Sequence, residues 1–213
     1  MPNLRPLVVF VLTAAALAHP VSAQQDVAAP PQAGAPAGRY ELDLSHASLI
    51  WRISHNGMSN YTARFARFDA TLDFDPARPE RSRIVATIDP TSVRTDFPVT
   101  AERDWDAELS RDARFFQSAK FPQIRFRSTD VVRTGPDTAN IRGDLTFLGV
   151  TRRIVLAAKL NGGMAVHPMT KKPAVGFSAK GVVRRSDYGM NYLVGQGIGD
   201  DVEIIIEAEF QKN

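Results

Sequence analysis

The sequence predicts an all-β protein whose antiparallel strands close into a barrel or pack as a sandwich, with one short helical insert. Most of the chain alternates apolar and polar residues with a period of two, which is typical of strands with one wet and one apolar face. Turn signals separate these segments, and one segment, 100–117, departs from the alternation. Eight or more strands in about 175 residues favour a closed barrel or a sandwich.

The chain begins with the features of a secretory signal peptide over residues 1–23. Arg5 gives a positive start, an apolar run follows over 7–18, and Val21-Ser22-Ala23 is a small-residue cleavage site. The apolar run is too short to span a bilayer comfortably. We therefore expect cleavage after Ala23 and export, to the periplasm if the source is a bacterium. An uncleaved membrane anchor is the alternative.

Residues 24–38 are rich in Ala, Pro, Gly and Gln, and Val27 is their one bulky apolar residue. Such a segment buries too little apolar surface to fold, so we expect a disordered linker. The folded domain is then expected over residues 39–213.

The first half of this domain predicts five strands. Asn56-Gly57 is a turn signal after the second strand, and the proline-containing segment 75–79 is a loop. Leu72 and Phe74 lie on one face of the fourth strand, and the fifth alternates in the same way. The expected strands are 40–44, 49–55, 62–69, 70–75 and 82–88.

The segment 100–117 predicts one or two short helices. Trp105 and Leu109 are four residues apart, as on one face of a helix, and the Phe115-Phe116 pair follows. Acidic residues in the first turns favour a helix N-terminus. Pro122 ends the segment.

Strands resume in the second half of the domain. The clearest hairpin covers 140–160, where apolar residues move from odd to even positions across a turn at 148–151 that contains a glycine. The final strand has apolar residues at every even position from Val202 to Phe210, and Ile205 is the exception on its polar side. The expected strands are 123–128, 130–134, the two of the 140–160 hairpin, 174–184 and 201–211.

Composition excludes several classes of protein. The chain has no cysteine, so it can form no disulfide and carry no lipidated cysteine. Its net charge is +3, or +2 once Arg5 leaves with the signal segment. Its basic residues form only pairs, such as Arg152-Arg153, which argues against nucleic-acid binding.

No catalytic or metal-binding pattern emerges from the residues. The chain has no G-x-S-x-G motif, and Ser54 and His55 are strand neighbours that point to opposite faces. His46 and His55 are nine residues apart, which is not a metal-ligand spacing. We therefore expect no enzyme activity, no metal and no cofactor. Arg184, Arg185 and Asp187 are expected to form ion pairs at the barrel rim, with an anionic head group as the alternative partner.

Several short motifs follow one another along residues 39–212. They are Tyr40-Glu41-Leu42-Asp43 with Ser45-His46, Ile53–Gly57, Ser92–Thr95, Leu109-Ser110, Arg114-Phe115-Phe116, Phe121–Ser128, Gly143–Thr151, Arg185–Met190 and Gly199–Val202. No single motif is specific, but in this order they resemble those of the YceI family of exported bacterial proteins, which bind polyisoprenoids or other lipids.

This resemblance implies a lipocalin-like antiparallel barrel of about eight strands. It implies an apolar interior that takes up a long lipid chain, such as an isoprenoid quinone, an isoprenoid phosphate or a fatty amide. The expected function is non-catalytic storage or transport of that lipid in the periplasm. Burial of a lipid chain gains about 0.8 kcal/mol per CH₂, and polar contacts at the mouth would orient the head group.

Fifteen residues are the candidate ligand contacts. Ten lie on the apolar faces of strands, where the alternative is an ordinary packed core; they are Trp51, Ile53, Phe65, Phe74, Phe126, Leu145, Phe147, Phe177, Ile204 and Ile206. Four form an apolar face of the helical segment, where packing beneath the helix is the alternative; they are Trp105, Leu109, Phe115 and Phe116. His55 is the candidate contact for a head group.

Three other functions stay open at this stage. They are a quinone-presenting accessory to a membrane cytochrome, an enzyme that acts on a lipid, and a structural barrel with a filled interior. A homodimer and a membrane protein that donates or accepts the lipid are open as partners.

Overall fold

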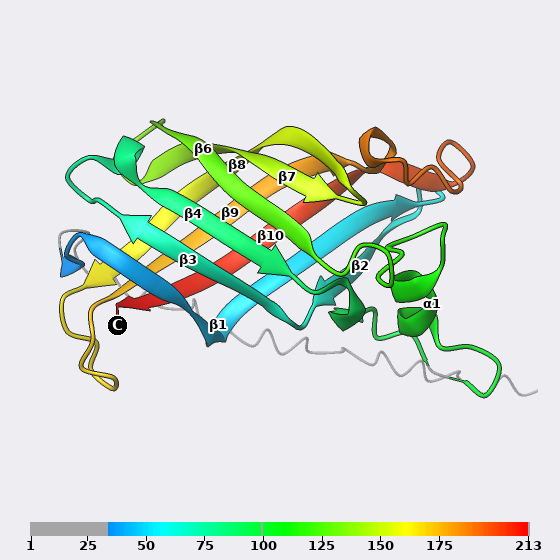
Figure 1. The fold of residues 1–213 in the computed structure, drawn as a ribbon, viewed down its shortest axis with the longest axis horizontal. Coiled ribbons are helices and arrows are strands. Elements are labelled where there is room, and N and C mark those ends of the chain that lie inside the picture. The colour runs from blue at the N-terminus through cyan, green and yellow to red at the C-terminus, as the bar shows by residue number, and fades with distance from the viewer. Residues whose placement is uncertain (1–33, 99, 213) are drawn as a thin grey trace, which may run out of the picture.

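The protein is an elongated barrel of antiparallel strands with a small helical insert at one end (Figure 1). The computed structural model describes residues 34–98 and 100–212. The expected signal peptide and residues 24–33 of the expected linker lie outside this range. No helix in the described part is long and apolar enough to cross a membrane.

Eight strands close the barrel, because β1 pairs with β10 and also with β3. The closed order is β1, β10, β9, β8, β7, β6, β4 and β3, and every pairing is antiparallel. The prediction of an all-β antiparallel barrel of about eight strands is confirmed. The strands are β1 (Gly38–His55), β3 (Phe68–Phe74), β4 (Arg83–Ile88), β6 (Ile124–Arg133), β7 (Thr138–Phe147), β8 (Val150–Met164), β9 (Ala174–Arg184) and β10 (Ile198–Lys212).

Two predicted strand boundaries, one in each half of the domain, were wrong. The segments 40–44 and 49–55 are one strand, β1, which bulges in the middle: Leu42 pairs with Phe210 and Ala47 pairs with Ala208, so four residues face Glu209 alone. A bulge interrupts the hydrogen-bonded ladder locally and bends the strand, but the strand continues beyond it. Because the bulge also breaks the apolar–polar alternation, the sequence pattern indicated two strands instead of one. The segments 123–128 and 130–134 are likewise one strand, β6, with an irregularity at Thr129.

The turn between the third and fourth expected strands also lies elsewhere. β2 (Ser59–Phe65) ends four residues before the expected end at Asp69, and β3 begins at Phe68, two residues before the expected start at Ala70. The backbone N–H groups of Ala66 and Arg67 donate to the carbonyl and hydroxyl oxygens of Ser92, each at 2.9 Å. These contacts with a residue distant in sequence fix the turn, so local alternation could not show it.

The β7–β8 hairpin is confirmed, with a tighter turn than expected. Phe147 pairs with Val150, which leaves only Leu148 and Gly149 in the loop. Both have positive φ angles, 49° and 76°, as in the two-residue turns whose twist matches that of the strands. A Cβ on Gly149 would lie 2.8 Å from the ring of Phe121.

The insert contains one helix, α1 (Trp105–Arg111), rather than two. The Asp104 carboxylate caps its N-terminus by accepting a hydrogen bond from the N–H of Ala107 at 3.0 Å. Within the described chain, β5 (Val93–Arg94) pairs with β2 alone, and α1 contacts β5. The insert connects β5 to β6, which do not pair with each other, and it lies at one end of the barrel (Figure 1).

Two hydrophobic clusters divide the interior. The α1-end cluster lies beneath the insert, and its buried members are Leu49, Trp51, Ala63, Phe65, Ile88, Val93, Leu109, Phe115, Ile124, Phe147, Leu148, Val183, Tyr188 and Met190. The far cluster lies toward the opposite end of the barrel, and its buried members are Ala35, Tyr40, Leu42, Ala70, Leu72, Phe74, Val175, Ala208 and Phe210.

The folded part begins earlier than the expected boundary at Arg39. Ala35 is buried in the far cluster, the carbonyl of Pro36 accepts a hydrogen bond from the hydroxyl of Tyr40 at 2.6 Å, and Gly38 starts β1. Residues 34–38 therefore join the fold, because neighbouring strands supply the burial that their own composition lacks.

Candidate binding cavity

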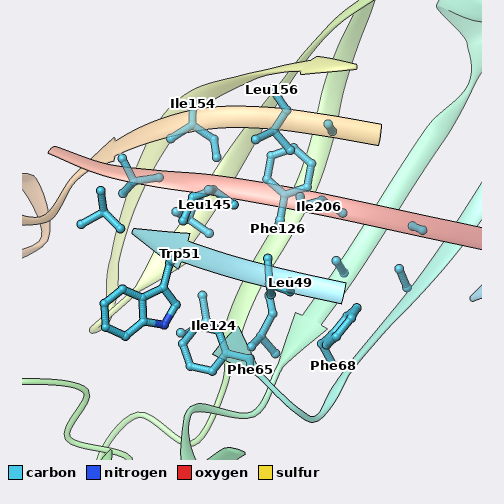
Figure 2. Close-up of a pocket in the computed structure, with 18 of the residues that line it drawn as sticks. Leu49, Trp51, Phe65, Phe68, Ile124, Phe126, Leu145, Ile154, Leu156 and Ile206 are labelled. Atoms are coloured by element: carbon cyan, nitrogen blue, oxygen red, sulfur yellow. The ribbon is translucent and has the colours of Figure 1, made fainter. Parts of the chain in front are cut away.

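A cavity of about 940 Å³ lies inside the barrel. Its walls are formed by inward-facing side chains of the strands, and Figure 2 shows Leu49, Trp51, Phe126 and Ile206 among them. The lining extends from Trp105 in the insert to Pro136 in the β6–β7 loop at the opposite end. The cavity is therefore long and touches both hydrophobic clusters.

Strand alternation produces this apolar wall. In β1 the inward residues are every second one from Leu49 to His55, and in β10 they are the even positions from Val202 to Phe210. Ile205, the apolar exception on the polar side of β10, is not part of the wall.

All fifteen candidate residues lie on the wall of this one cavity; they are Trp51, Ile53, His55, Phe65, Phe74, Trp105, Leu109, Phe115, Phe116, Phe126, Leu145, Phe147, Phe177, Ile204 and Ile206. The four insert residues belong to the α1-end cluster or pack against it. Contact of the fifteen residues with a ligand stays a prediction.

The aromatic residues of the insert are in contact with those of the strands. Phe116 packs against Phe65, Phe147 and Trp51, with ring centroids 5.4, 5.9 and 6.4 Å apart. Trp105 meets Phe115 edge to face at 5.4 Å. Such pairs favour a fixed geometry, so the insert forms a covering for this end of the cavity.

Charged residues form the rim of the cavity at the insert. The Glu108 carboxylate accepts hydrogen bonds from Arg103 at 3.0 Å and from Arg114 at 3.1 Å. The guanidinium of Arg103 lies 4.3 Å from the ring centroid of Trp105, where it makes a cation–π contact. Arg114 also pairs with Asp112 and lowers the pKa of that carboxyl to about 2.

The prediction that Arg184, Arg185 and Asp187 form an ion-pair cluster was wrong, because the two arginines have other partners. Arg184 points outward and pairs with Asp200 and Asp201, at 3.8 and 3.4 Å. Arg185 is 4% exposed and lines the cavity. It donates hydrogen bonds to the carbonyls of Gly199 (2.8 Å), Met190 (3.1 Å) and Tyr192 (2.8 Å). The 3-10 helix η4 (Arg185–Tyr188) sets this direction, and simple strand alternation contains no sign of it.

Sequence reasoning also missed Tyr61 and Met190, which line the cavity. The alternation of β2 could have revealed Tyr61, because it shares a face with Ala63 and Phe65. Met190 lies in an irregular segment after η4, where no periodicity applies.

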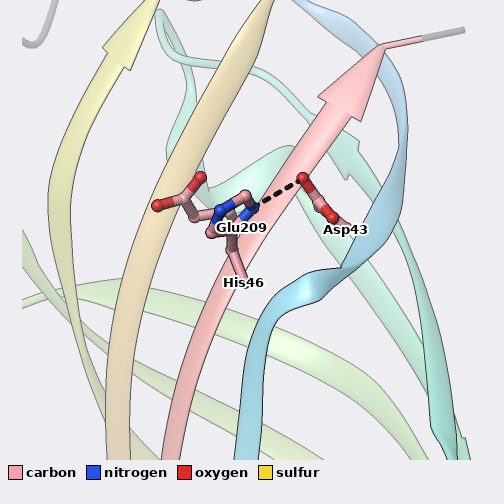
Figure 3. Close-up of side chains that lie close together, drawn as sticks. All are labelled: Asp43, His46 and Glu209. Atoms are coloured by element: carbon pink, nitrogen blue, oxygen red, sulfur yellow. Dashed lines mark hydrogen bonds and ion pairs between the residues drawn. The ribbon is translucent and has the colours of Figure 1, made fainter.

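One polar cluster lies outside the cavity, at the bulge of β1. His46 Nδ1 lies 3.0 Å from Asp43 Oδ2, with Glu209 beside them (Figure 3). Asp43 also accepts hydrogen bonds from the Ser45 N–H at 2.9 Å and from Gln211 Nε2 at 2.8 Å. The hydrogen bond between the two side chains lowers the pKa of Asp43 and raises that of His46. These contacts hold the bulge in shape, and we assign the cluster that structural role.

The fold and the cavity define a class of protein: a small antiparallel barrel whose interior is wide enough to hold an apolar ligand. The chain belongs to the YceI-like domain family, which it matches over residues 40–210. It is 38% identical to Protein YceI of Escherichia coli O157:H7 over 175 residues, which cover 81% of this chain and 86% of that protein.

Solved structures share the fold. The Campylobacter jejuni YCEI protein is 30% identical, with a TM-score of 0.64 over 73% of this chain and 87% of that one. Burkholderia cenocepacia BcnA has a TM-score of 0.67 at 19% identity, over 79% and 98% of the two chains. A polyisoprenoid binding domain from Saccharophagus degradans has a TM-score of 0.60 at 15% identity, over 82% and 98%.

Proposed function

We propose that this protein binds the long apolar chain of a lipid inside its barrel and stores or carries it without catalysis. The observation that carries the proposal is the cavity of about 940 Å³ with an apolar wall through both hydrophobic clusters. Each CH₂ moved from water into such a wall gains about 0.8 kcal/mol. An elongated lipid chain suits the cavity because the lining continues along the barrel.

The placement of charged side chains supports binding rather than reaction. Among the residues that the structure describes, the charged groups and the histidine on the wall lie near its two ends, and the middle is aliphatic and aromatic. The charged and histidine lining residues are His55, Arg103, Glu108, Arg114 and Arg185 at the insert end and Arg83, Arg133 and Asp137 at the opposite end. An enzyme acting on a lipid would need reactive groups brought together around one bond.

The chemical class of the lipid is proposed from the family and from one relative. The Saccharophagus degradans domain of the same fold is a polyisoprenoid binding domain. A polyisoprenoid quinone or phosphate, or a fatty amide, combines a long apolar chain with a polar head group, and the cavity has a polar rim at each end. We further propose that the protein acts in the periplasm after loss of residues 1–23.

Uptake of a fluorescent apolar chain tests the proposal. The purified domain is titrated with a polyene fatty acid whose emission rises in an apolar environment, and unlabelled isoprenoid is then added as competitor. We expect saturable uptake at one ligand per barrel and displacement by the isoprenoid. Uptake that never saturates, or that the isoprenoid does not displace, would contradict the proposal.

A further inference from the structure

Four buried side-chain atoms in the described part of the chain have no hydrogen-bond partner. They are Trp51 Nε1, Tyr61 Oη, Arg185 Nη2 and Tyr188 Oη. Buried polar groups are normally paired, so each unpaired group needs an explanation. All four belong to the insert end of the barrel, which is the half that holds the α1-end cluster.

Three of the four atoms belong to residues on the cavity wall: Trp51, Tyr61 and Arg185. The rings of Trp51 and Tyr61 are neighbours, with centroids 6.2 Å apart. Tyr188 is not a lining residue; its ring centroid lies 5.5 Å from that of Phe147. Three unpaired groups thus belong to residues that line the cavity.

These three groups share one chemical character. An indole N–H can only donate a hydrogen bond, a guanidinium can only donate, and a phenol can donate. All three groups can therefore be satisfied by a ligand that only accepts hydrogen bonds. The set therefore matches oxygen acceptors, such as the carbonyl of a quinone or amide, or the oxygens of a phosphate.

Arg185 adds a positive charge to this set. Its Nε and Nη1 atoms are used in three hydrogen bonds to backbone carbonyls, which leaves Nη2 free. Within residues 34–98 and 100–212 it forms no salt bridge, and Asp200 acts on it only from a distance. A buried guanidinium stays protonated, so its free N–H groups favour a nearby oxygen with negative charge or partial charge.

The opposite end of the barrel differs. The Tyr40 hydroxyl, which is buried there, donates to the carbonyl of Pro36 at 2.6 Å. Arg83 and Arg133 donate to backbone carbonyls of their own loops and are exposed. That end leaves no buried donor without a partner among the described residues.

We propose that the insert end of the cavity holds an oxygen acceptor of the lipid head group, bound by Trp51 Nε1, Tyr61 Oη and Arg185 Nη2, while the apolar chain extends toward the far cluster. This inference rests on the proposed function, since it assigns the orientation and head-group class of the same ligand. It requires small side-chain rotations, because all three atoms are closed off from water in this structure.

Three isoprenoid probes of similar chain length test the proposal: a hydrocarbon without a head group, an isoprenoid quinone, and an isoprenyl phosphate. The affinity of each is measured by competition for the wild type, for Tyr61→Phe and for Trp51→Phe. Tyr40→Phe is the matched control, because it removes a hydroxyl at the opposite end from a residue outside the cavity wall.

We expect each insert-end variant to weaken binding of the probes with head groups about fivefold more than it weakens binding of the hydrocarbon, in line with loss of one hydrogen bond. A preference of the wild type for the phosphate that Arg185→Gln removes would assign the acceptor to a phosphate; equal binding of quinone and phosphate would assign it to any carbonyl or phosphate oxygen. Thermal unfolding of each variant verifies that it is folded.

The outcomes separate the two proposals. Failure of all three probes to bind would overturn the proposed function itself. Equal binding of all three, with no selective effect of Tyr61→Phe or Trp51→Phe, would overturn the head-group assignment and leave the function standing. A selective effect of Tyr40→Phe as large as that of Tyr61→Phe would show that the loss does not depend on the insert-end donors and would also overturn the assignment.

Discussion

The two ends of this barrel are built from the same kind of strand, but they differ in whether their buried polar side chains have hydrogen-bond partners. In the far cluster, Tyr40 is fully buried, its ring meets Phe74 edge to face at 6.0 Å, and its hydroxyl is paired. In the α1-end cluster, Trp51 and Tyr61 are packed, yet their polar atoms have no partner. The buried polar group of the far cluster is thus satisfied as in an ordinary core, whereas the α1-end cluster keeps polar atoms without a partner, as a head-group site that awaits a ligand would.

This contrast explains where stability and binding are expected to separate. A residue that fills a core adds to the free energy of unfolding. A residue that lines a cavity loses part of its packing to the empty space, so its removal costs less stability and more affinity. Substitutions of Tyr40, which does not line the cavity, and of lining residues at the α1 end should therefore have opposite profiles.

The largest expected effect on stability belongs to the far cluster. Tyr40→Ala removes a fully buried ring and should lower the free energy of unfolding by about 3–5 kcal/mol. Phe116→Ala, in the insert, should cost roughly half of that, because Phe116 is half-buried and already borders the cavity. Urea denaturation of both variants measures the difference. An equal decrease in the free energy of unfolding for the two variants would contradict the proposed difference between a filled core position and a cavity-lining position.

Binding should respond in the opposite sense at the α1 end. Phe147→Glu places a carboxyl group on the apolar wall and should weaken lipid retention by more than about tenfold, because a buried carboxylate is poorly solvated there. Val155→Glu is the matched control, since Val155 lies on the outer face of the adjacent strand β8. Retention is measured by competition with the fluorescent chain. A folded Phe147→Glu variant that retains lipid would remove Phe147 from the binding surface.

A substitution at the N-cap of α1 should loosen the insert that covers this end of the cavity without changing the residues of the cavity wall. Asp104→Ala removes the N-cap of α1 and should cost about 1 kcal/mol of stability. Because α1 lies over this end of the cavity, we expect faster lipid release as well, measured by stopped-flow displacement. Asp104→Asn retains a capping side chain and should restore the slow rate. Unchanged release from the alanine variant would show that the lipid does not pass by this helix.

The smallest expected effect is a pH dependence at the β1 bulge, on the far half of the barrel. The Asp43 contact raises the pKa of His46 above 6.5, so its stabilising contribution is complete below pH 6.5 and is lost as the pH rises through the raised value. His46 is 60% exposed, so the effect is modest. Melting temperatures at pH 5.5 and 8 should differ less in His46→Gln than in the wild type. An identical pH dependence in both proteins would contradict this role.

The ion pair between Arg114 and Asp112, on the rim of the insert, should have a different pH dependence. Arg114 lowers the pKa of Asp112 to about 2, so this pair stabilises the rim at all pH values above about 4 and is lost only as the pH falls toward 2. The rim should therefore be unaffected over the range in which His46 titrates.

The sequence predicted the barrel well because alternation and turns are local. The Asn140–Leu160 hairpin lies where its periodicity placed it, and so does the final strand, which was expected over 201–211 and is β10 (Ile198–Lys212). The bulge at Asp43–His46 divided one strand into two, because its geometry depends on pairing with Glu209 and Gln211 far along the chain. The turn at Ala66-Arg67 depends in the same way on Ser92.

For the cavity, alternation identified the apolar wall but not its polar positions. Each of the fifteen candidates lies on the wall, because inward and outward faces follow directly from the period of two. Arg185 was expected in an ion-pair cluster at the rim. Arginine is seldom buried, and only the fold shows that three carbonyls hold Arg185 inside. Whether a pocket is open or filled depends on side-chain packing, which periodicity does not encode.

Native mass spectrometry of the protein, purified gently from its source organism, tests the central claim most directly. We predict a protein mass that includes one lipid of polyisoprenoid or long-chain type, lost when the protein is denatured and absent from Phe147→Glu. A protein that carries no lipid from its source and takes none up from added isoprenoid would contradict the account.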